Sequence, residues 1–157
     1  MKKMQSLSPA DLQGKRVLVR FDLNVPIGDD GLVHDSDADR IRKSLPTLDY
    51  LKNAGAQVII IAHIGRDPKE TLKPVADYMK IPLFPLKDFS VAELEHNQVV
   101  LLENLRSIPG EELNDPEFAA HLASYAELYV NDAFSVSHRA HASVVGVAQL
   151  LPAYAGL

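Results

Sequence analysis

Four segments of the chain are largely apolar and rich in β-branched residues, and they lack the strict alternation of a strand with one face in water. They are residues 15–21, 58–62, 98–102 and 128–130, and the short segment 82–85 is a further strand candidate. Apolar runs of this length are typical of strands that are covered on both faces, as they are in a parallel sheet. The hydrophobic pattern therefore predicts a sheet in the middle of the fold.

Between these segments the apolar residues recur every three or four positions, which is the spacing of one helix face. Helices are predicted over 38–53, 69–79, 115–126 and 142–151, with a helical turn over 89–94 and a loop over the glycine- and aspartate-rich segment 27–39. Gly55 is placed to end the first helix, whereas Pro46 inside it predicts a kink or two shorter helices. Asp115 and Pro116 are typical of a helix N-terminus.

Strands and helices alternate along the whole chain, and this order indicates the fold class. Alternation at this spacing predicts βαβ units with right-handed crossovers. We therefore expect an α/β, Rossmann-like three-layer domain with a mostly parallel sheet flanked by helices. The composition of 46% hydrophobic and 24% charged residues is ordinary for a globular protein, and no repeat or composition break divides residues 1–157. A single domain is expected.

Charge and cysteine content narrow the classes of function. A formal net charge of −5 argues against nucleic acid as a partner, because proteins that bind the phosphate backbone need a basic surface. No apolar run approaches the length of a membrane span, so no membrane partner is expected. The chain has no cysteine, which excludes disulfides and thiolate metal sites and agrees with a cytoplasmic location, the one we expect.

Polar residues suited to an anion follow the predicted strands. Asp22 and Asn24 follow the first strand, His63, Gly65 and Arg66 the second, Arg106 follows 98–102, and His138, Arg139 and His141 follow 128–130. In an open α/β sheet the ligand lies beyond the carboxyl ends of the strands, where these loops would meet. Arginine binds phosphate or carboxylate through two parallel hydrogen bonds, so a phosphorylated small molecule is the expected ligand.

Each of these residues taken alone has an ordinary structural explanation. An exposed arginine is usually a solvated charge, and Asp22 with Asn24 is equally consistent with an Asx turn at the end of a strand. The pair His138 and His141 has an intervening arginine and no nearby carboxylate, so no metal site is expected. No Walker A sequence and no Gly-x-Gly-x-x-Gly motif occurs among the eight glycines.

Several polar segments, read together, resemble the N-terminal domain of the phosphoglycerate kinase family. They read Val-Arg-Phe-Asp-Leu-Asn-Val-Pro at 19–26, Asp-Arg-Ile-Arg at 39–42, Ala-His-Ile-Gly-Arg at 62–66, Leu-Glu-Asn-Leu-Arg at 102–106, Val-Asn-Asp-Ala-Phe at 130–134 and Ser-His-Arg-Ala-His-Ala-Ser at 137–143. The segments follow the order of the family and span nearly the whole chain.

The resemblance implies a role for each matching residue. Asp22 and Asn24 would hold the hydroxyl side of 3-phosphoglycerate, and the phosphate would be surrounded by His63, Arg66, Arg106 and Arg139, with Gly65 in the same substrate-binding loop. Arg40 is the catalytic candidate, because in the family this position meets the substrate carboxylate and the phosphoryl group in flight. The acceptor carboxylate is already ionised at neutral pH, so no general base is needed.

The resemblance also implies a division of labour with a second domain. The family moves a phosphoryl group between 1,3-bisphosphoglycerate and ADP, and its C-terminal nucleotide-binding domain, which holds Mg-ATP or Mg-ADP, is not matched in this chain. We expect residues 1–157 to bind 3-phosphoglycerate or 1,3-bisphosphoglycerate without a cofactor and to be inactive alone, and the full-length enzyme to be a monomer. Two alternatives remain: a haloacid-dehalogenase-type phosphatase with Asp22 as nucleophile, which Asn24 disfavours, and a non-catalytic phosphate-ligand-binding module.

Overall fold

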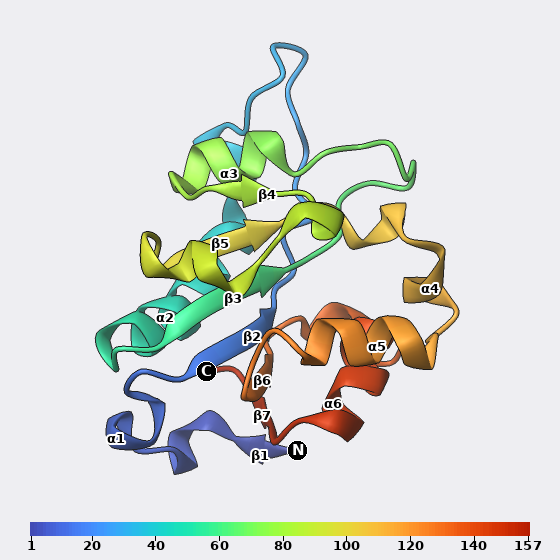
Figure 1. Cartoon of the computed structure of the whole chain (residues 1–157). Coiled ribbons are helices and arrows are strands. Elements are labelled where there is room, and N and C mark those ends of the chain that lie inside the picture. The colour runs from blue at the N-terminus through green and yellow to red at the C-terminus, as the bar shows by residue number, and fades with distance from the viewer.

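A single parallel sheet runs through the middle of the computed structural model, which describes residues 1–157 (Figure 1). Its seven strands have the order β1-β7-β6-β2-β3-β5-β4, and every neighbouring pair is parallel. The strands are β1 (Lys2–Lys3), β2 (Arg16–Arg20), β3 (Gln57–Ile61), β4 (Leu83–Phe84), β5 (Val99–Leu102), β6 (Leu128–Asn131) and β7 (Ala153–Ala155). The prediction of a mostly parallel sheet is confirmed.

Helices cover both faces of the sheet (Figure 1). They are α1 (Pro9–Leu12), α2 (Asp39–Asn53), α3 (Lys73–Met79), α4 (Pro109–Glu112), α5 (Pro116–Ala123) and α6 (Val147–Leu150), with a π-helical turn over Ala142–Gly146. Short 3₁₀ turns lie at Met4–Ser6, Asp35–Asp37, Leu86–Asp88, Val91–Glu95, Leu105–Ser107 and Phe134–Val136.

The two faces of the sheet form two separate cores, because successive side chains of a strand point in opposite directions. Val19 and Ile60 point to the side that α2 and α3 cover, in a cluster of 24 buried residues. Leu18 and Ile59 point to the side of α5 and α6, in a cluster of 15. The chain therefore has the three layers that the sequence predicts.

The largest difference from the sequence prediction concerns α2, which is one continuous helix with Pro46 inside it. The prediction of two shorter helices is wrong. Pro46 lies on the exposed side, where water can satisfy the carbonyl group that proline leaves without a partner. Ile41 and Leu48, before and after it, are both buried in the core on this face of the sheet, so both halves of the helix pack against it. Gly55 ends the helix as predicted, with a φ of +80°.

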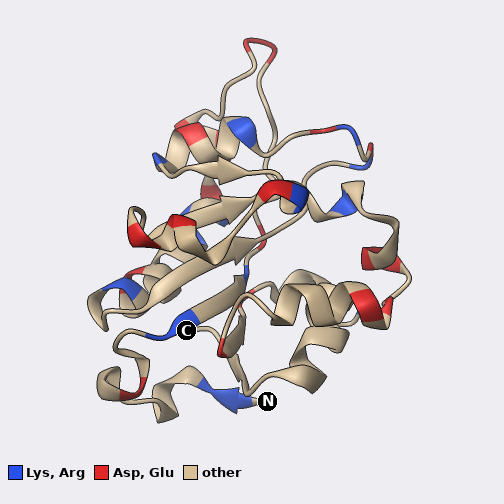
Figure 2. Cartoon of the chain, in the orientation of Figure 1, with Lys and Arg blue, Asp and Glu red and all other residues tan.

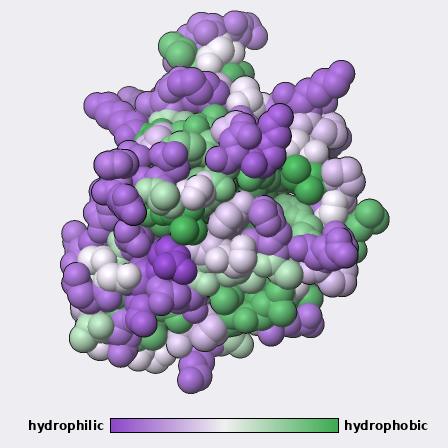
Figure 3. Space-filling model, in the orientation of Figure 1, coloured by the Kyte–Doolittle hydropathy of each residue, from purple (hydrophilic) through white to green (hydrophobic).

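The surface has no single dominant charge. Lysine and arginine are interspersed with aspartate and glutamate in Figure 2. Figure 3 shows an apolar patch over α6, where Leu150 is 53% exposed. A membrane-crossing helix would have to be longer and more apolar than any helix of this chain.

Candidate functional site

The predicted site residues come from loops that leave neighbouring strands at one edge of the sheet. The strand order places β6, β2, β3 and β5 side by side, and all of them end at this edge. Asp22, His63, Arg106 and Arg139 follow β2, β3, β5 and β6. The structure thus brings these four loops to one edge of the sheet, as the sequence predicts, and their role in binding a ligand stays a prediction.

Asp22 links three segments at this edge. Its Oδ1 accepts hydrogen bonds from the backbone N–H of Asn24 and from Nη1 of Arg40, both at 3.2 Å. Its Oδ2 accepts from the Ser135 hydroxyl at 2.7 Å. The Asx turn that the sequence left as an alternative is therefore present, and the same carboxylate also fixes Arg40 and the loop after β6.

Arg40 lies in the first turn of α2, between two clefts. One cleft, of about 860 Å³, extends along Asn24, Gly65 and Lys69, and the other, of about 490 Å³, lies between Asp22 and Phe134. The Arg40 side chain is half exposed and also donates to the backbone oxygen of Asn24 at 3.1 Å. The strand-end pattern misses Arg40, because it considers only residues directly after strands. The helix of a crossover also begins at the carboxyl edge.

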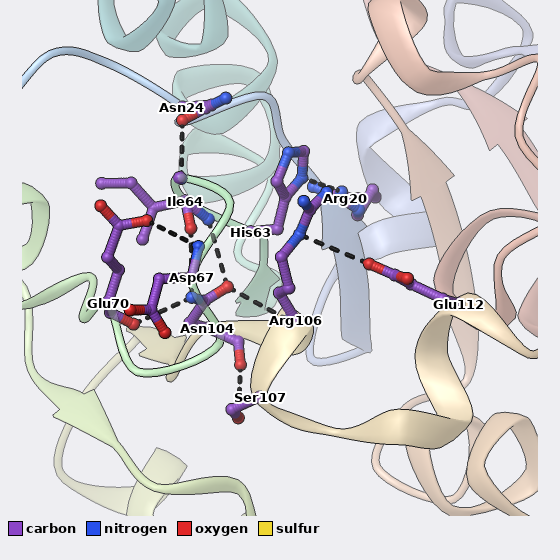
Figure 4. Close-up of polar contacts among 11 residues, drawn as sticks. Arg20, Asn24, His63, Ile64, Asp67, Glu70, Asn104, Arg106, Ser107 and Glu112 are labelled. Atoms are coloured by element: carbon purple, nitrogen blue, oxygen red, sulfur yellow. Dashed lines mark hydrogen bonds and ion pairs between the residues drawn. The ribbon is translucent and has the colours of Figure 1, made fainter.

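The loop after β3 is held by two asparagines from neighbouring loops (Figure 4). Oδ1 of Asn24 accepts from the Gly65 N–H at 2.9 Å. Asn104 is fully buried, and its Oδ1 accepts from the Ile64 and Arg106 N–H groups at 3.1 Å while its amide donates to the carbonyls of Ile64 and Glu70. The loop conformation is therefore set before any ligand binds.

Gly65 has a φ of +65°, and a Cβ at this position would overlap the Glu70 carboxylate. Its N–H is already used by Asn24. The positive φ therefore favours glycine at this position, and the exposed Glu70 side chain would have to move to make room for a Cβ.

His63 is 9% exposed and contacts a buried arginine, as Figure 4 shows. Nη2 of Arg20 lies 2.8 Å from Nδ1 of His63. Burial lowers the pKa of His63 to about 4, and the positive charges of Arg20, Arg106 and Arg139 act in the same direction. His63 is thus neutral at pH 7 and contributes a hydrogen bond rather than a charge to the site.

The remaining predicted cations differ in their surroundings. Arg106 is partly buried, with Nε 3.6 Å from Oε1 of Glu112. Arg139 is exposed, and its charge adds to the effect of burial, which is the main cause of the lowered pKa of both His63 and His141. Arg66 is exposed, and its side chain contacts none of the other predicted residues through a hydrogen bond or ion pair. The structure thus places His63 and Arg106 along one small cavity, with Arg139 near enough for its charge to act on His63, and it leaves Arg66 at the margin.

Besides Arg40, the strand-end pattern misses two further residues of the candidate site, Arg20 and Asn104. Arg20 is the last residue of β2, and a charged residue inside an apolar strand is a signal in itself, since arginine is seldom buried without partners. Asn104 shows no comparable signal, because its role depends on which loops the fold brings together. His138 is exposed, and no group of three His, Asp or Glu side chains is placed to hold a metal ion.

The fold and the candidate site together define an all-parallel α/β domain that gathers arginines, a neutral histidine and polar side chains at the carboxyl edge of its sheet, an arrangement suited to a small anion. The chain belongs to the phosphoglycerate kinase family. The model of that family, described as "Phosphoglycerate kinase", matches residues 7–157. The predicted family is thereby confirmed.

Individual relatives agree with this assignment. The phosphoglycerate kinase of Thermosynechococcus vestitus is 49% identical over an alignment that covers 99% of this chain and 42% of that protein. The enzyme of Thermus thermophilus is 48% identical, with 98% and 42% covered. Among solved structures, phosphoglycerate kinase from Coxiella burnetii superposes with a TM-score of 0.81 at 33% identity and covers 98% of this chain and 40% of its own.

The structure of phosphoglycerate kinase from Pyrococcus horikoshii gives a TM-score of 0.83 at 26% identity, over 99% of this chain and 42% of that one. The chain therefore spans about 42% of the length of the curated relatives it matches. Family membership also removes the phosphatase alternative. Both oxygens of Asp22, its proposed nucleophile, are hydrogen-bonded within the protein.

Proposed function

We propose that residues 1–157 are the acceptor-binding domain of a phosphoglycerate kinase, which transfers a phosphoryl group between 1,3-bisphosphoglycerate and ADP in the cytoplasm. The observation that supports this most strongly is the convergence of four strand-end loops and the first turn of α2 at one edge, in a chain that matches the family over residues 7–157. The domain would act as part of a monomeric two-domain enzyme.

In this proposal different residues bind different parts of the ligand. Arg66, Arg106 and Arg139 would hold the phosphate of 3-phosphoglycerate, with His63 as a neutral donor. Asp22 and the Asn24 amide, whose N–H donors are free, would hold the hydroxyl side. Gly65 would serve by shaping the loop, since its N–H is bonded to Asn24. Arginine suits the phosphate position because its planar fork can form two parallel bonds and keeps its charge at any relevant pH.

Arg40 would act on the transferring phosphoryl group. Its guanidinium lines both clefts and is tied to Asp22 and to the backbone of Asn24, so its position relative to the hydroxyl side is fixed. Phosphoryl transfer requires stabilisation of charge on the moving oxygens and correct placement of the acceptor. A positioned arginine supplies both, and an ionised carboxylate acceptor needs no base.

The nucleotide that the family uses with Mg²⁺ does not fit this chain. No glycine-rich phosphate loop is present, Asp22 is occupied by Arg40 and Ser135, and Asp39 is paired with Lys43 at 3.1 Å. We therefore place the nucleotide on the family's other domain. By itself this chain would be a binding module for the acceptor, without turnover.

The test is an NMR titration of the ¹⁵N-labelled chain with 3-phosphoglycerate and, separately, with Mg-ATP. We expect saturable, salt-sensitive shifts at the Gly65, Arg106 and Arg139 amides with 3-phosphoglycerate and none with Mg-ATP. The matched control is Lys52→Ala, which removes an exposed cation at the opposite end of α2 and should leave the titration unchanged. No shift at millimolar 3-phosphoglycerate would show that the site assignment is wrong.

A further inference from the structure

Arg20 is buried in the central strand β2 with only 1% of its surface exposed, and no carboxylate is paired with it. Its guanidinium instead donates to three different groups. Nε donates to the Ser143 hydroxyl at 3.1 Å, Nη1 to the Phe21 carbonyl at 2.6 Å, and Nη2 faces Nδ1 of His63 at 2.8 Å. One of the three partners is thus a side chain of the proposed substrate site.

The chemistry of this contact fixes the state of His63. A guanidinium has only N–H donors and no acceptor, so Nδ1 must present its lone pair to Arg20. A neutral imidazole carries one proton, which must then lie on Nε2, away from Arg20. A protonated imidazole would place its Nδ1–H against an N–H of Arg20 Nη2. A flipped imidazole ring would leave that buried guanidinium N–H without a hydrogen-bond partner.

Arg20 is itself held in place from several sides, so it cannot follow a movement of the histidine. The Ser143 hydroxyl accepts the hydrogen bond from Arg20, and the Ser143 carbonyl accepts one from the Tyr129 hydroxyl at 2.6 Å. The N–H of Ser143 donates to Oε1 of the buried Glu111 at 2.7 Å. The guanidinium is therefore fixed by β2, by the turn at 142–146 and, through Ser143, by α4.

The charges around His63 favour the same neutral state. Beyond the effect of burial, the charges of Arg20, Arg106 and Arg139 lower the pKa of His63 and that of Asp22 raises it, while Glu111, Glu112 and His141 line the same small cavity. A fourth cation would be repelled here in the absence of a ligand. The histidine can contribute directionality to anion binding without adding to this repulsion.

We propose that Arg20 is a positioning residue that locks His63 in its neutral Nε2–H tautomer, so that His63 serves a phosphate-bearing ligand as an uncharged hydrogen-bond donor. The identity of that ligand rests on the proposed function. The lock itself belongs to the ligand-free protein and can be measured without any ligand.

The direct experiment records long-range ¹H–¹⁵N spectra of the histidines in the unaltered chain between about pH 5 and about pH 8. We expect Nδ1 of His63 to resonate as an unprotonated nitrogen and Nε2 as a protonated one, with no titration in this range. A scalar coupling across the hydrogen bond between Nη2 of Arg20 and Nδ1 of His63 should be visible. A proton on Nδ1, or a titration midpoint within the range, would overturn the proposal.

Substitution then tests the dependence on Arg20. In Arg20→Met we expect His63 to become a mixture of tautomers, with a titration midpoint that rises toward its ordinary pKa of about 6.5 but stays below it, because burial and the charges of Arg106 and Arg139 remain. Sulfate, whose charge does not change in this range, should then bind Arg20→Met more tightly at about pH 5 than at about pH 8. The double variant Arg20→Met with His63→Gln is the reference, and the change in Arg20→Met should exceed the change in the double variant at least threefold. An unchanged His63 tautomer and midpoint in Arg20→Met would overturn the proposal. If this variant does not fold, the coupling and the tautomer in the unaltered chain decide alone.

Arg16→Met is the matched control, because Arg16 lies in the same strand and donates to the Tyr125 carbonyl at 2.9 Å, away from the site. It should leave the tautomer and titration of His63 unchanged. The outcomes separate the two proposals. Binding of 3-phosphoglycerate with a proton on Nδ1 overturns the lock and keeps the proposed function. The predicted tautomer without binding of 3-phosphoglycerate keeps the lock and overturns the proposed function.

Discussion

The candidate site has a buried part and an exposed part, which are built in opposite ways. In the buried part, Arg20, His63 and Asn104 are at most 9% exposed and are tied into the fold by hydrogen bonds. In the exposed part, the side chains of Arg66 and Arg139 make no hydrogen bond and no ion pair. The buried part fixes the geometry of the site, and the exposed part supplies positive charges that are free to bind a ligand. Substitutions in the first should therefore affect stability and loop shape, and those in the second should affect affinity.

Arg40 combines features of both parts, because it is half exposed yet tied to Asp22. In a two-domain enzyme that contains this domain, Arg40→Ala should lower kcat by about 10²–10³-fold, the loss typical of one donor to a developing oxyanion. The affinity for 3-phosphoglycerate should fall much less, since charge on the transferring oxygens develops only in the transition state. Steady-state kinetics with a separate binding titration measure both. Equal losses in rate and in affinity would make Arg40 a substrate clamp.

Asn104 tests the buried part. Replacement by leucine, which has a similar size, leaves the N–H of Ile64 and the carbonyls of Ile64 and Glu70 without their partner. We expect the free energy of unfolding to fall by about 2–4 kcal/mol, because buried polar groups are then left unsatisfied. Urea denaturation measures this loss. Asn53→Ala, at an exposed position at the end of α2, is the control and should change stability by less than about 0.5 kcal/mol.

Arg66 tests the exposed part. Arg66→Ala should weaken binding of 3-phosphoglycerate by about 1.5–3 kcal/mol, the range of a hydrogen bond to a charged group. Its stability should change by less than about 0.5 kcal/mol, because the side chain has no partner in the protein. Calorimetric titration and urea denaturation of the same variant separate the two effects. A loss of stability with unchanged affinity would reverse the assignment of Arg66 to the ligand.

The same division explains what the sequence could predict. The strands β2, β3, β5 and β6 are buried on both faces and show clear apolar runs, and their parallel order brings Asp22, His63, Arg106 and Arg139 to one edge. Nothing comparable marks β1 and β7, which are two and three residues long and lie at or next to the edge of the sheet. Their pairing depends on the whole fold rather than on a local pattern.

The contacts that hold the site could not be predicted for a related reason. Arg20 and His63 are 43 positions apart, and Asn104 is 40 positions from Ile64. Their roles depend on distances of about one hydrogen bond between loops, which no periodicity encodes. The resemblance to the family does point to Arg40 as a candidate, because it compares whole segments rather than the ends of strands.

The smallest expected effect concerns Asp132, which lines the 490 Å³ cleft together with Asp22 and Arg40. Burial raises the pKa of Asp132 to about 6 from an ordinary value of 3.8, and a hydrogen bond from Thr47 offsets part of this shift. The folded state thus binds this proton more tightly than the unfolded state does. The resulting contribution to stability is complete below about pH 4 and is lost as the pH rises through about 6.

Asp132→Asn should remove this part of the pH dependence. At pH 8 the variant should be more stable than the unaltered chain by about 1 kcal/mol, a value kept small because solvent reaches the carboxylate and screens it. Urea denaturation at intervals between about pH 4 and about pH 8 gives the two curves. Asp49→Asn, at an exposed position on α2, should leave the curve unchanged. Parallel curves for Asp132→Asn and the unaltered chain would mean that Asp132 is ionised at the same pH in both states, and the half-buried carboxylate would then belong with the exposed part of the site.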